Sequence, residues 1–332
     1  MKNQIKIKLY SLIVMLTALL LLNGFANDDQ PTITKIFDMN QPGTLNASSS
    51  GGGVQVKTHD QPKVEIQAFV RKNGRLLSSS DRDLNEILEN FELDFSKNGS
   101  AISAVVKRKS RMNFLNNVGI SLTILVPREM SCNVSSSGGG VKVYGVKGTH
   151  NFSSSGGGVQ IENVTGTTEA KSSGGGVKAY KQNGNIRLSS SGGGVTVEDA
   201  IGTISAHSSG GGVHLNNIHG DAEASSSGGG VSVNGEADYV KATSSGGSVR
   251  IDIRGLSKEL YLKSSGGGVS AIIHDGDKLG LDLDLRSDRV NIDLHNFSGT
   301  SEKDRVNGTM NNGGIPVYMR ASGGNINMSF ND

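Results

Sequence analysis

The sequence predicts an all-β fold, a parallel β-solenoid (β-helix) with 18-residue rungs. A Gly-Gly pair, preceded by serine and followed by valine three residues after its first glycine, recurs every 18 residues between positions 138 and 246. A fixed period in this range is typical of solenoids, in which each repeat buries its apolar side only against its neighbours. With 47 glycines, 9 phenylalanines and no tryptophan among 332 residues, the chain is too poor in aromatic residues for a large globular core. Its 35% hydrophobic content is sufficient for a narrow core.

Residues 1–26 are typical of an export signal. Lys2, Lys6 and Lys8 precede the apolar run 12–22, and Gly24 and Ala26 are the small residues that a signal peptidase requires. The run is shorter than the ~20 residues of a membrane span, so we expect cleavage and no transmembrane segment afterwards. An uncleaved anchor is the alternative. No cysteine lies near the cleavage point, which argues against a lipoprotein.

Residues 27–126 are less regular and are predicted to form N-terminal rungs and a cap. They contain an early copy of the repeat, SSSGGGVQV at 48–56, which stands 87 residues before the next copy. The alternation over 64–68 predicts a strand, and 91–96 with 101–107 predict a hairpin around an Asn-Gly turn. Apolar residues at 84, 87, 88 and 91 predict one short helix near 83–91, for which Asp83 and Glu86 are a candidate capping pair.

Residues 127–265 are predicted to be the regular solenoid. In one repeat, Val195 and Val197 alternate with Thr196 and Glu198, as in a strand with one buried side. Gly202 then marks a bend, and a second strand follows before the next glycines, so we expect about two strands and two bends per rung. Glycine suits such bends because it adopts positive φ at little cost. The predicted structural core is the valine column Val141, Val159, Val177, Val195, Val213, Val231 and Val249.

The serines before the glycines form a second column. We expect their hydroxyls to form hydrogen bonds along the stack, with rungs about 4.8 Å apart. Cys132 falls in register with an interior column of the second strand, which favours a buried structural thiol. The serine column consists of Ser154, Ser172, Ser190, Ser208, Ser226 and Ser244.

Residues 266–332 are predicted to be C-terminal rungs and a cap. The period loosens there, although apolar residues still alternate over 281–285 and 290–294. A last copy, ASGGNINMSF at 321–330, closes the chain. Irregular end rungs are expected to cover sheet edges that would otherwise recruit other chains.

Charge and cysteine content exclude several functions. Removal of the three signal lysines leaves 30 basic against 31 acidic side chains, so we expect no nucleic-acid partner. A single cysteine allows no internal disulfide. Valine follows each glycine triplet where a phosphate-binding loop requires Gly-Lys-Ser/Thr, and the bends lack the carboxylates of calcium-binding β-rolls.

We expect no metal site and no cofactor. His207, His214 and His219 lie close in sequence and His150 lies one strand away, but zinc requires three or four converging ligands. His214 shares an outward column with basic residues, which favours solvated surface. The acidic turn 274–277 is isolated and is interpreted simply as a turn.

Catalytic residues are not predicted either, although one pair of carboxylates was weighed. Glu162 and Glu198 share an outward column two rungs apart, about 9.6 Å by strand spacing. This separation lies at the wide edge of an inverting carboxylate pair, so spacing alone does not exclude catalysis. Charged outward residues on strands are nevertheless common.

The most binding-like surface in the sequence is a ladder of Lys142 and Tyr144 with Lys178 and Tyr180. Tyrosines and polar ladders of this kind take up sugars or other proteins, so a glycan or an envelope or surface protein is the expected partner. Ordinary strand-favouring surface residues are the alternative interpretation.

The export signal, the repeated SSSGGGVxV and the closing ASGGNINMSF together resemble the bacterial putative-adhesin families, β-strand repeat proteins frequent in Bacteroidota. These families are related to the "head GIN" autotransporter-adhesin domain, and the resemblance covers roughly residues 34–330. It implies a parallel β-solenoid, an envelope or surface location and a binding or scaffolding role. It supplies no catalytic residues.

The sequence therefore predicts an exported, adhesin-like, non-catalytic β-solenoid located in the periplasm, on the outer surface or in the medium. Two alternatives stay open. One is a polysaccharide-active β-helix enzyme, and the other is a purely structural periplasmic protein.

Overall fold

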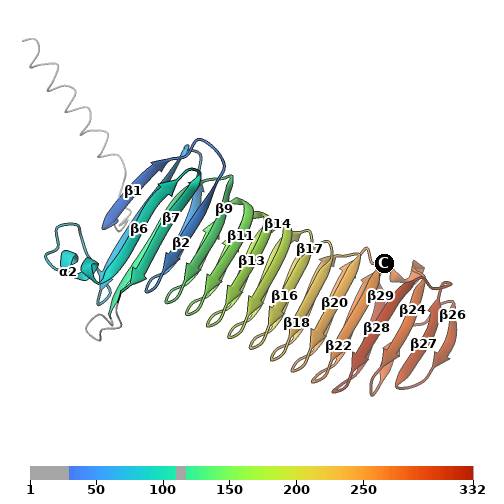
Figure 1. The fold of residues 1–332 in the computed structure, drawn as a ribbon. Helices are drawn as coiled ribbons and strands as arrows, with labels where there is room; N and C mark the ends of the chain where they lie inside the picture. Colours follow the sequence, from blue (N-terminus) through green and yellow to red (C-terminus); the bar gives the residue numbers. More distant parts are fainter. Residues whose placement is uncertain (1–29, 110–116, 332) are drawn as a thin grey trace, which may run out of the picture.

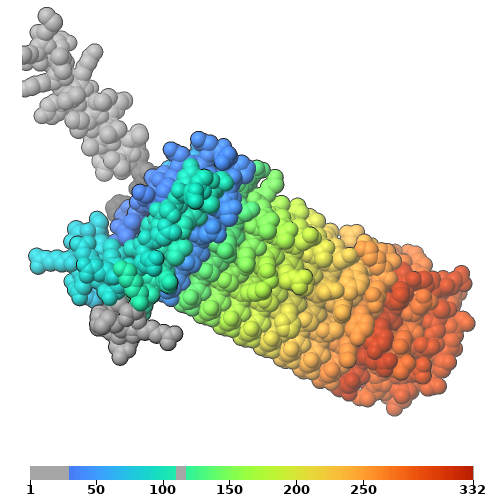
Figure 2. Space-filling view, in the orientation of Figure 1, coloured from blue at the N-terminus to red at the C-terminus, as the bar shows by residue number. Residues whose placement is uncertain are grey.

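The computed structural model describes residues 30–109 and 117–331, so the export signal predicted for residues 1–26 lies outside the described residues. The chain forms an elongated rod of stacked strands (Figure 1). In Figure 2 the sequence colours follow one another in bands along the rod, as expected when each rung contacts its neighbours. The predicted β-solenoid is confirmed. No helix in the described part of the chain is long and apolar enough to cross a membrane.

The regular rungs consist of two ladders of parallel strands, as predicted. In the first ladder Val141 pairs with Val159 and Val159 with Val177, and the seven valines of the predicted core column are each at most 2% exposed. The first ladder contains β10 (Val141–Tyr144), β12 (Val159–Glu162), β14 (Val177–Ser190), β15 (Val195–Ile201), β17 (Val213–His219), β19 (Val231–Glu236), β21 (Val249–Arg254) and β23 (Val269–His274). The second contains β9 (Met130–Ser136), β11 (Lys147–Ser154), β13 (Thr165–Ser172), the end of β14, β16 (Ile204–Ser208), β18 (Ala222–Ser226), β20 (Tyr239–Ser244) and β22 (Glu259–Ser264).

Each of the central rungs also has a kink between its two strands that the sequence analysis did not predict. One residue per rung adopts a left-handed conformation, with φ of 55° at Asn163 and 58° at Asp199. The next residue then points inward and is buried, as at Val164 and Ala200. The kink therefore adds an interior column to the two predicted strands. The left-handed residues are Gly145, Asn163, Lys181, Asp199 and Asn217.

The predicted serine column is buried and bridges successive rungs. Ser190 Oγ accepts a hydrogen bond from the Gly193 N–H in its own rung, at 3.1 Å. The same hydroxyl donates to the Gly175 carbonyl of the preceding rung, at 2.8 Å. Both hydrogen-bonding roles of the hydroxyl are thus satisfied away from water. The pattern repeats along the stack, at Ser154, Ser172, Ser226 and Ser244 among others.

The glycine triplets are required for space, which corrects the reason given from the sequence. None of the triplet glycines has a positive φ. A Cβ placed on Gly193 would instead lie 2.5 Å from the backbone nitrogen of Gly176 in the preceding rung. The positive-φ argument holds at the opposite bend, where Gly202 has φ of 122°.

The early repeat copy forms a rung inside the stack. Its strands β2 (Gly43–Ser49) and β3 (Val54–His59) pair with β9 and β10 on one side, so that Val54 aligns with Val141. On the other side they pair with β7 (Ala101–Arg108) and β8 (Val118–Pro127). After β3 the chain therefore forms a further layer on the outer side of this rung, and it then continues on the inner side as β9 and β10. In Figure 2 the blue and teal segments interleave at this end.

The C-terminal end uses the same arrangement. The last copy contributes β28 (Ile315–Ala321) and β29 (Ile326–Asn331), which lie between β22 and β23 on one side and β24 (Leu281–Arg286) and β25 (Val290–Ile292) on the other. A short 3-10 turn, η2 (Gly276–Lys278), precedes β24. Antiparallel pairings appear at both ends, although β25, the last strand of the first ladder, remains parallel to β29. The outer strands are β1 (Ile33–Asp38), β4 (Lys63–Lys72), β5 (Arg75–Leu76), β6 (Phe91–Asn98), β26 (Phe297–Ser301) and β27 (Arg305–Met310).

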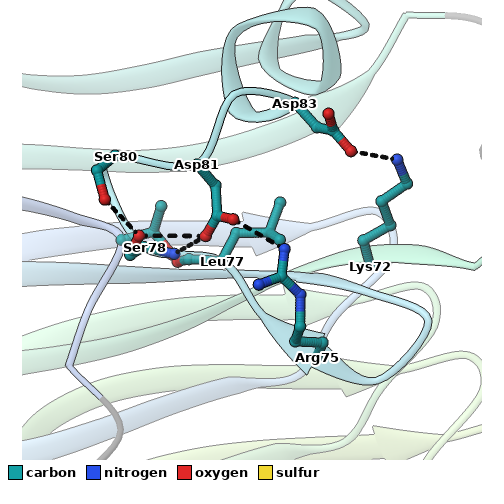
Figure 3. Close-up of polar contacts among 8 residues, drawn as sticks. Lys72, Arg75, Leu77, Ser78, Ser80, Asp81 and Asp83 are labelled. Atoms are coloured by element: carbon teal, nitrogen blue, oxygen red, sulfur yellow. Dashed lines mark hydrogen bonds and ion pairs between the residues drawn. The ribbon is translucent and has the colours of Figure 1, made fainter.

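The predicted short helix is present as α2 (Leu84–Glu89), but its predicted capping pair is wrong. The Asp83 side chain forms no cap hydrogen bond. It binds Lys72 Nζ at 2.7 Å, and this contact lowers the pKa of the Asp83 carboxyl (Figure 3). In the same loop Asp81 binds Arg75, which lowers its pKa, and accepts the Ser78 N–H (Figure 3).

One interior column of the second ladder is polar near the N-terminal end of the stack, at Cys132, His150 and Thr168. Cys132 is 2% exposed, and burial raises its pKa to about 12, so the prediction of a buried thiol is confirmed. His150, its neighbour in the next rung, is 3% exposed and stacks on Phe152. Neither ring nitrogen of His150 has a hydrogen-bond partner among the residues that the structure describes. Burial lowers the pKa of His150 to about 4.

The inward and outward assignments give a first prediction. Val195→Asp buries an unpaired carboxylate between rungs and should lower the free energy of unfolding by about 3 kcal/mol or more. Thr196→Asp, one residue along on the outer face, should change it by less than about 0.5 kcal/mol. Urea unfolding of both variants provides the measurement. Equal effects would contradict the assigned faces.

Removal of one bridging hydroxyl tests the serine column. Ser190→Ala leaves the Gly193 N–H and the Gly175 carbonyl without this partner, and should cost about 1–3 kcal/mol of unfolding free energy. Ser189→Ala is the matched control, because Ser189 points outward on the same strand. Urea unfolding that shows the same small change in both variants would refute the bridging role.

The buried histidine predicts a pH dependence of stability. The unfolded chain takes up a proton on His150 near its ordinary pKa of 6.5, whereas the folded protein takes it up only near 4. Stability should therefore fall between pH 6.5 and pH 4, by roughly 3 kcal/mol in total. In His150→Leu this part of the decrease should be absent when urea unfolding is measured at pH 7, 5 and 4. An unchanged pH dependence in the variant would contradict the prediction.

Candidate functional site

The four residues of the predicted ladder lie on one outer face, in two rungs that are not adjacent. Lys142 and Tyr144 are on β10, and Lys178 and Tyr180 are on β14. The intervening strand β12 places Gln160 and Glu162 between the two pairs. The lysines are exposed and the tyrosines half-buried. The ladder is therefore interrupted, and its role in binding stays a prediction.

The candidate pair of carboxylates is likewise separated by an intervening rung. Glu162 and Glu198 share a column two rungs apart, and Tyr180 lies between them. The backbone register reproduces the arrangement expected from the repeat. The geometry places no other acid between the two carboxylates.

The histidines do not converge. His207 lies on β16, and its Nδ1 is 2.8 Å from Ser225 Oγ, whereas His214 lies on the other ladder, on β17. His150 is in the interior. Within residues 30–109 and 117–331, no three His, Cys, Asp or Glu side chains are placed to hold a metal ion.

The depressions on the first-ladder side of the rod include two that have charged residues in their lining. The larger has a volume of about 630 Å³ and lies over β3, β4 and β8, where Phe69 and Leu125 adjoin Lys57 and Arg71. The smaller, about 370 Å³, is polar and lies over β17, β19, β21 and β23. In it His274 Nε2 is 2.8 Å from Asp252 Oδ1, beside Glu236 and Arg254.

A group of outward cations and tyrosines is aligned across neighbouring strands of the second ladder, near the C-terminal end. Here four consecutive strands, β22, β28, β24 and β27, each place a cation at the same level of the sheet (Figure 1). We call these residues the C-terminal basic row: Lys263, Arg320, Arg286 and Arg305. Lys263 and Arg305 are exposed. The Arg286 and Arg320 side chains are 40% and 32% exposed.

A stacked tyrosine pair lies beside this row. The rings of Tyr261 and Tyr318 are 4.7 Å apart and inclined by only 9°. Lys241 Nζ lies 5.8 Å from the centre of the Tyr261 ring, and the Arg320 guanidinium lies 5.0 Å from the centre of the Tyr318 ring. Arg320 Nε also donates to the Tyr318 hydroxyl. The rings and cations thus form one alternating assembly.

One carboxylate lies among these cations. Asp284 is 3.0 Å from Arg286 and 3.7 Å from Arg320. Two other acidic residues, Glu259 and Asp282, lie on the far side of the tyrosine pair from the basic row. The Asp282 carboxylate accepts the Gly314 N–H. Glu302 and Asp304 lie beside Arg305 in the turn between β26 and β27, and the Glu302 N–H donates to the Arg305 carbonyl. Within the row itself, four cations face the single carboxylate of Asp284.

The sequence analysis missed this group because its members are distant in the chain. Tyr261 and Tyr318 become neighbours only when β28 inserts beside β22. A signal was nevertheless present. The closing repeat was recognised from residue 321 onward, but its three preceding residues, Tyr-Met-Arg at 318–320, match Tyr-Leu-Lys at 261–263 before the previous glycines.

Comparison with known proteins gives similarity only among solved structures, since no family model and no curated protein matches the chain. A putative adhesin from Parabacteroides merdae is 10% identical with a TM-score of 0.41, over 89% of this chain and 95% of the other. A putative adhesin from Bacteroides fragilis is 12% identical with a TM-score of 0.34, over 90% and 99%. A putative lipid binding protein from Parabacteroides distasonis is 12% identical with a TM-score of 0.36, over 91% and 97%.

Proposed function

We propose that the protein is an exported, adhesin-like β-solenoid that binds its partner without catalysis, through the outward columns of its strands. The observation that carries this proposal is the parallel register of the rungs, which is regular apart from a shift between Leu215 and Ile218 where β17 pairs with β19. It places outward side chains in straight rows about one strand spacing apart, on a core that fixes their positions. A preformed surface of this kind binds with little loss of conformational entropy.

The extended shape supports a repetitive or surface-borne partner. A rod of stacked rungs offers long, flat faces in place of one deep cavity, and such faces suit a glycan chain or another protein of the envelope. The described residues group tyrosines and cations on these faces, side chains that are frequent in binding surfaces.

A polysaccharide-active enzyme is the second candidate, and the column spacing of Glu162 and Glu198 is the observation that favours it. In such an enzyme one carboxyl group would act as acid and the other as base on opposite sides of a glycosidic bond. The two functions differ in outcome, because an enzyme releases products whereas an adhesin retains its ligand.

The test incubates purified protein with immobilised envelope and host glycans and with intact cells, and measures both retention and new reducing ends. We expect retention without turnover. Turnover that Glu162→Gln or Glu198→Gln abolishes would establish the enzyme instead, with Gln160→Glu as a control for surface charge. Absence of any binding would favour a purely structural role.

Export is tested separately by locating the protein. Cell fractionation combined with protease treatment of intact cells should place the protein outside the cytoplasm, with loss of the full-length band if it is on the outer surface. Recovery only in the cytoplasmic fraction would contradict the proposed export.

A further inference from the structure

We propose that the C-terminal basic row and the adjoining tyrosine pair form a binding site for an acidic polysaccharide, a linear glycan that carries carboxylate or sulfate groups. This inference rests on the binding function proposed above and assigns it to one surface. The inference is supported by three features of the described residues: the alignment of the cations, the stacking of the tyrosines and the linear geometry of the row.

The first feature is the alignment of like charges. Lys263, Arg320, Arg286 and Arg305 are direct cross-strand neighbours, and like charges in such positions destabilise a sheet. Asp284 offsets part of this repulsion, at Arg286 and Arg320. No ion pair is formed by Lys263 or Arg305 with any acidic side chain of the described chain. An anionic ligand would remove the remaining repulsion.

The second feature, the stacking of the tyrosines, argues against nucleic-acid bases as ligands. Proteins hold single-stranded nucleic acid by stacking its bases on open aromatic faces. Here Lys241 and Tyr318 are the cross-strand neighbours of Tyr261 on its two sides, so both faces of this ring are occupied. Tyr318 is stacked on Tyr261 and contacts the Arg320 guanidinium as well. The ring edges and the Tyr261 hydroxyl are left to meet a ligand, and the Tyr318 hydroxyl, which accepts the Arg320 Nε–H, can still donate its own proton. These groups suit the hydroxyl-rich surface of a sugar.

The third feature is the linear spacing. Successive cations of the row lie on successive strands, about 4.8 Å apart by strand spacing. A chain with repeated acidic groups can place several anions along such a row, whereas a single phosphate neutralises only part of it. The arginines add bidentate recognition of a carboxylate or sulfate. The Tyr318–Arg320 contact holds one guanidinium in position before the ligand arrives.

The test compares two double variants with equal change in charge. Lys263→Gln with Arg305→Gln removes the two exposed cations of the row and leaves the tyrosine stack intact. Lys181→Gln with Arg187→Gln is the control, because it removes an exposed lysine and an exposed arginine of a central rung, outside both the basic row and the predicted ladder. Circular dichroism and thermal unfolding establish that both variants keep the fold.

Binding is measured by titration with polygalacturonate, dextran sulfate, uncharged dextran, single-stranded oligodeoxythymidine and inorganic phosphate. We expect the unmodified protein to bind at least one of the two acidic polysaccharides, more weakly as salt rises. The basic-row variant should bind roughly tenfold more weakly and show a smaller salt dependence. The Lys181/Arg187 variant should bind as the unmodified protein does.

Several outcomes would overturn the assignment. These are equal binding of uncharged dextran, stronger binding of oligodeoxythymidine or of phosphate alone, or equal losses in the two variants. If the protein is retained by cells or other glycans but ignores both acidic polysaccharides, the site assignment is wrong and the proposed adhesin-like function stands. If it is retained by nothing, the proposed function itself fails.

Discussion

The whole stack depends on how closely the backbone of one rung approaches the next at the serine-glycine bend. A buried serine hydroxyl receives an N–H of its own rung and donates to a carbonyl of the rung before it, so each rung is attached to its neighbour at the same point. The contact requires glycine at this bend, because the backbone of the neighbouring rung occupies the space that a Cβ would need. Since buried polar groups are costly when unpaired, this bend tolerates few other sequences. That constraint explains why the repeat is so regular there and so variable on the outer columns.

The period alone was enough to predict the regular part of the fold. A spacing of 18 residues aligns Val141 with Val159 and Cys132 with His150, and the structure shows both alignments. The kink at Asn163 and Asp199 was not predicted, because asparagine and aspartate adopt a left-handed conformation more readily than most residues but do not require it. The role of the triplet glycines was misassigned for a related reason. A glycine in the sequence shows that a side chain is absent, but it does not show whether a positive φ or a close backbone contact requires that absence.

The end rungs could not be derived from the period, because their neighbours are set by long-range pairing. The copy at 48–56 and the copy at 321–330 each lie between a regular rung and a layer that the chain builds elsewhere. The result adds antiparallel outer strands beyond the parallel ladders at both ends, while β25 stays parallel to β29. It also assembles surfaces from segments far apart in sequence. The Tyr261–Tyr318 stack is one of these, and so is the contact of Arg286 with Arg320 across β24 and β28.

The central rungs show that the charge of the C-terminal basic row is not a requirement of the fold. Followed back along the rod, the same column contains Thr243, Ser225, His207, Ser189, Lys171 and Ser153. Its single lysine is paired with Glu169 on the same strand, at 2.6 Å. Those rungs keep the same pairing and the same buried serine without a row of cations. Because cross-strand repulsion makes such a row unfavourable by itself, its confinement to four adjoining strands beside a stacked tyrosine pair is better explained by an anionic partner than by stability.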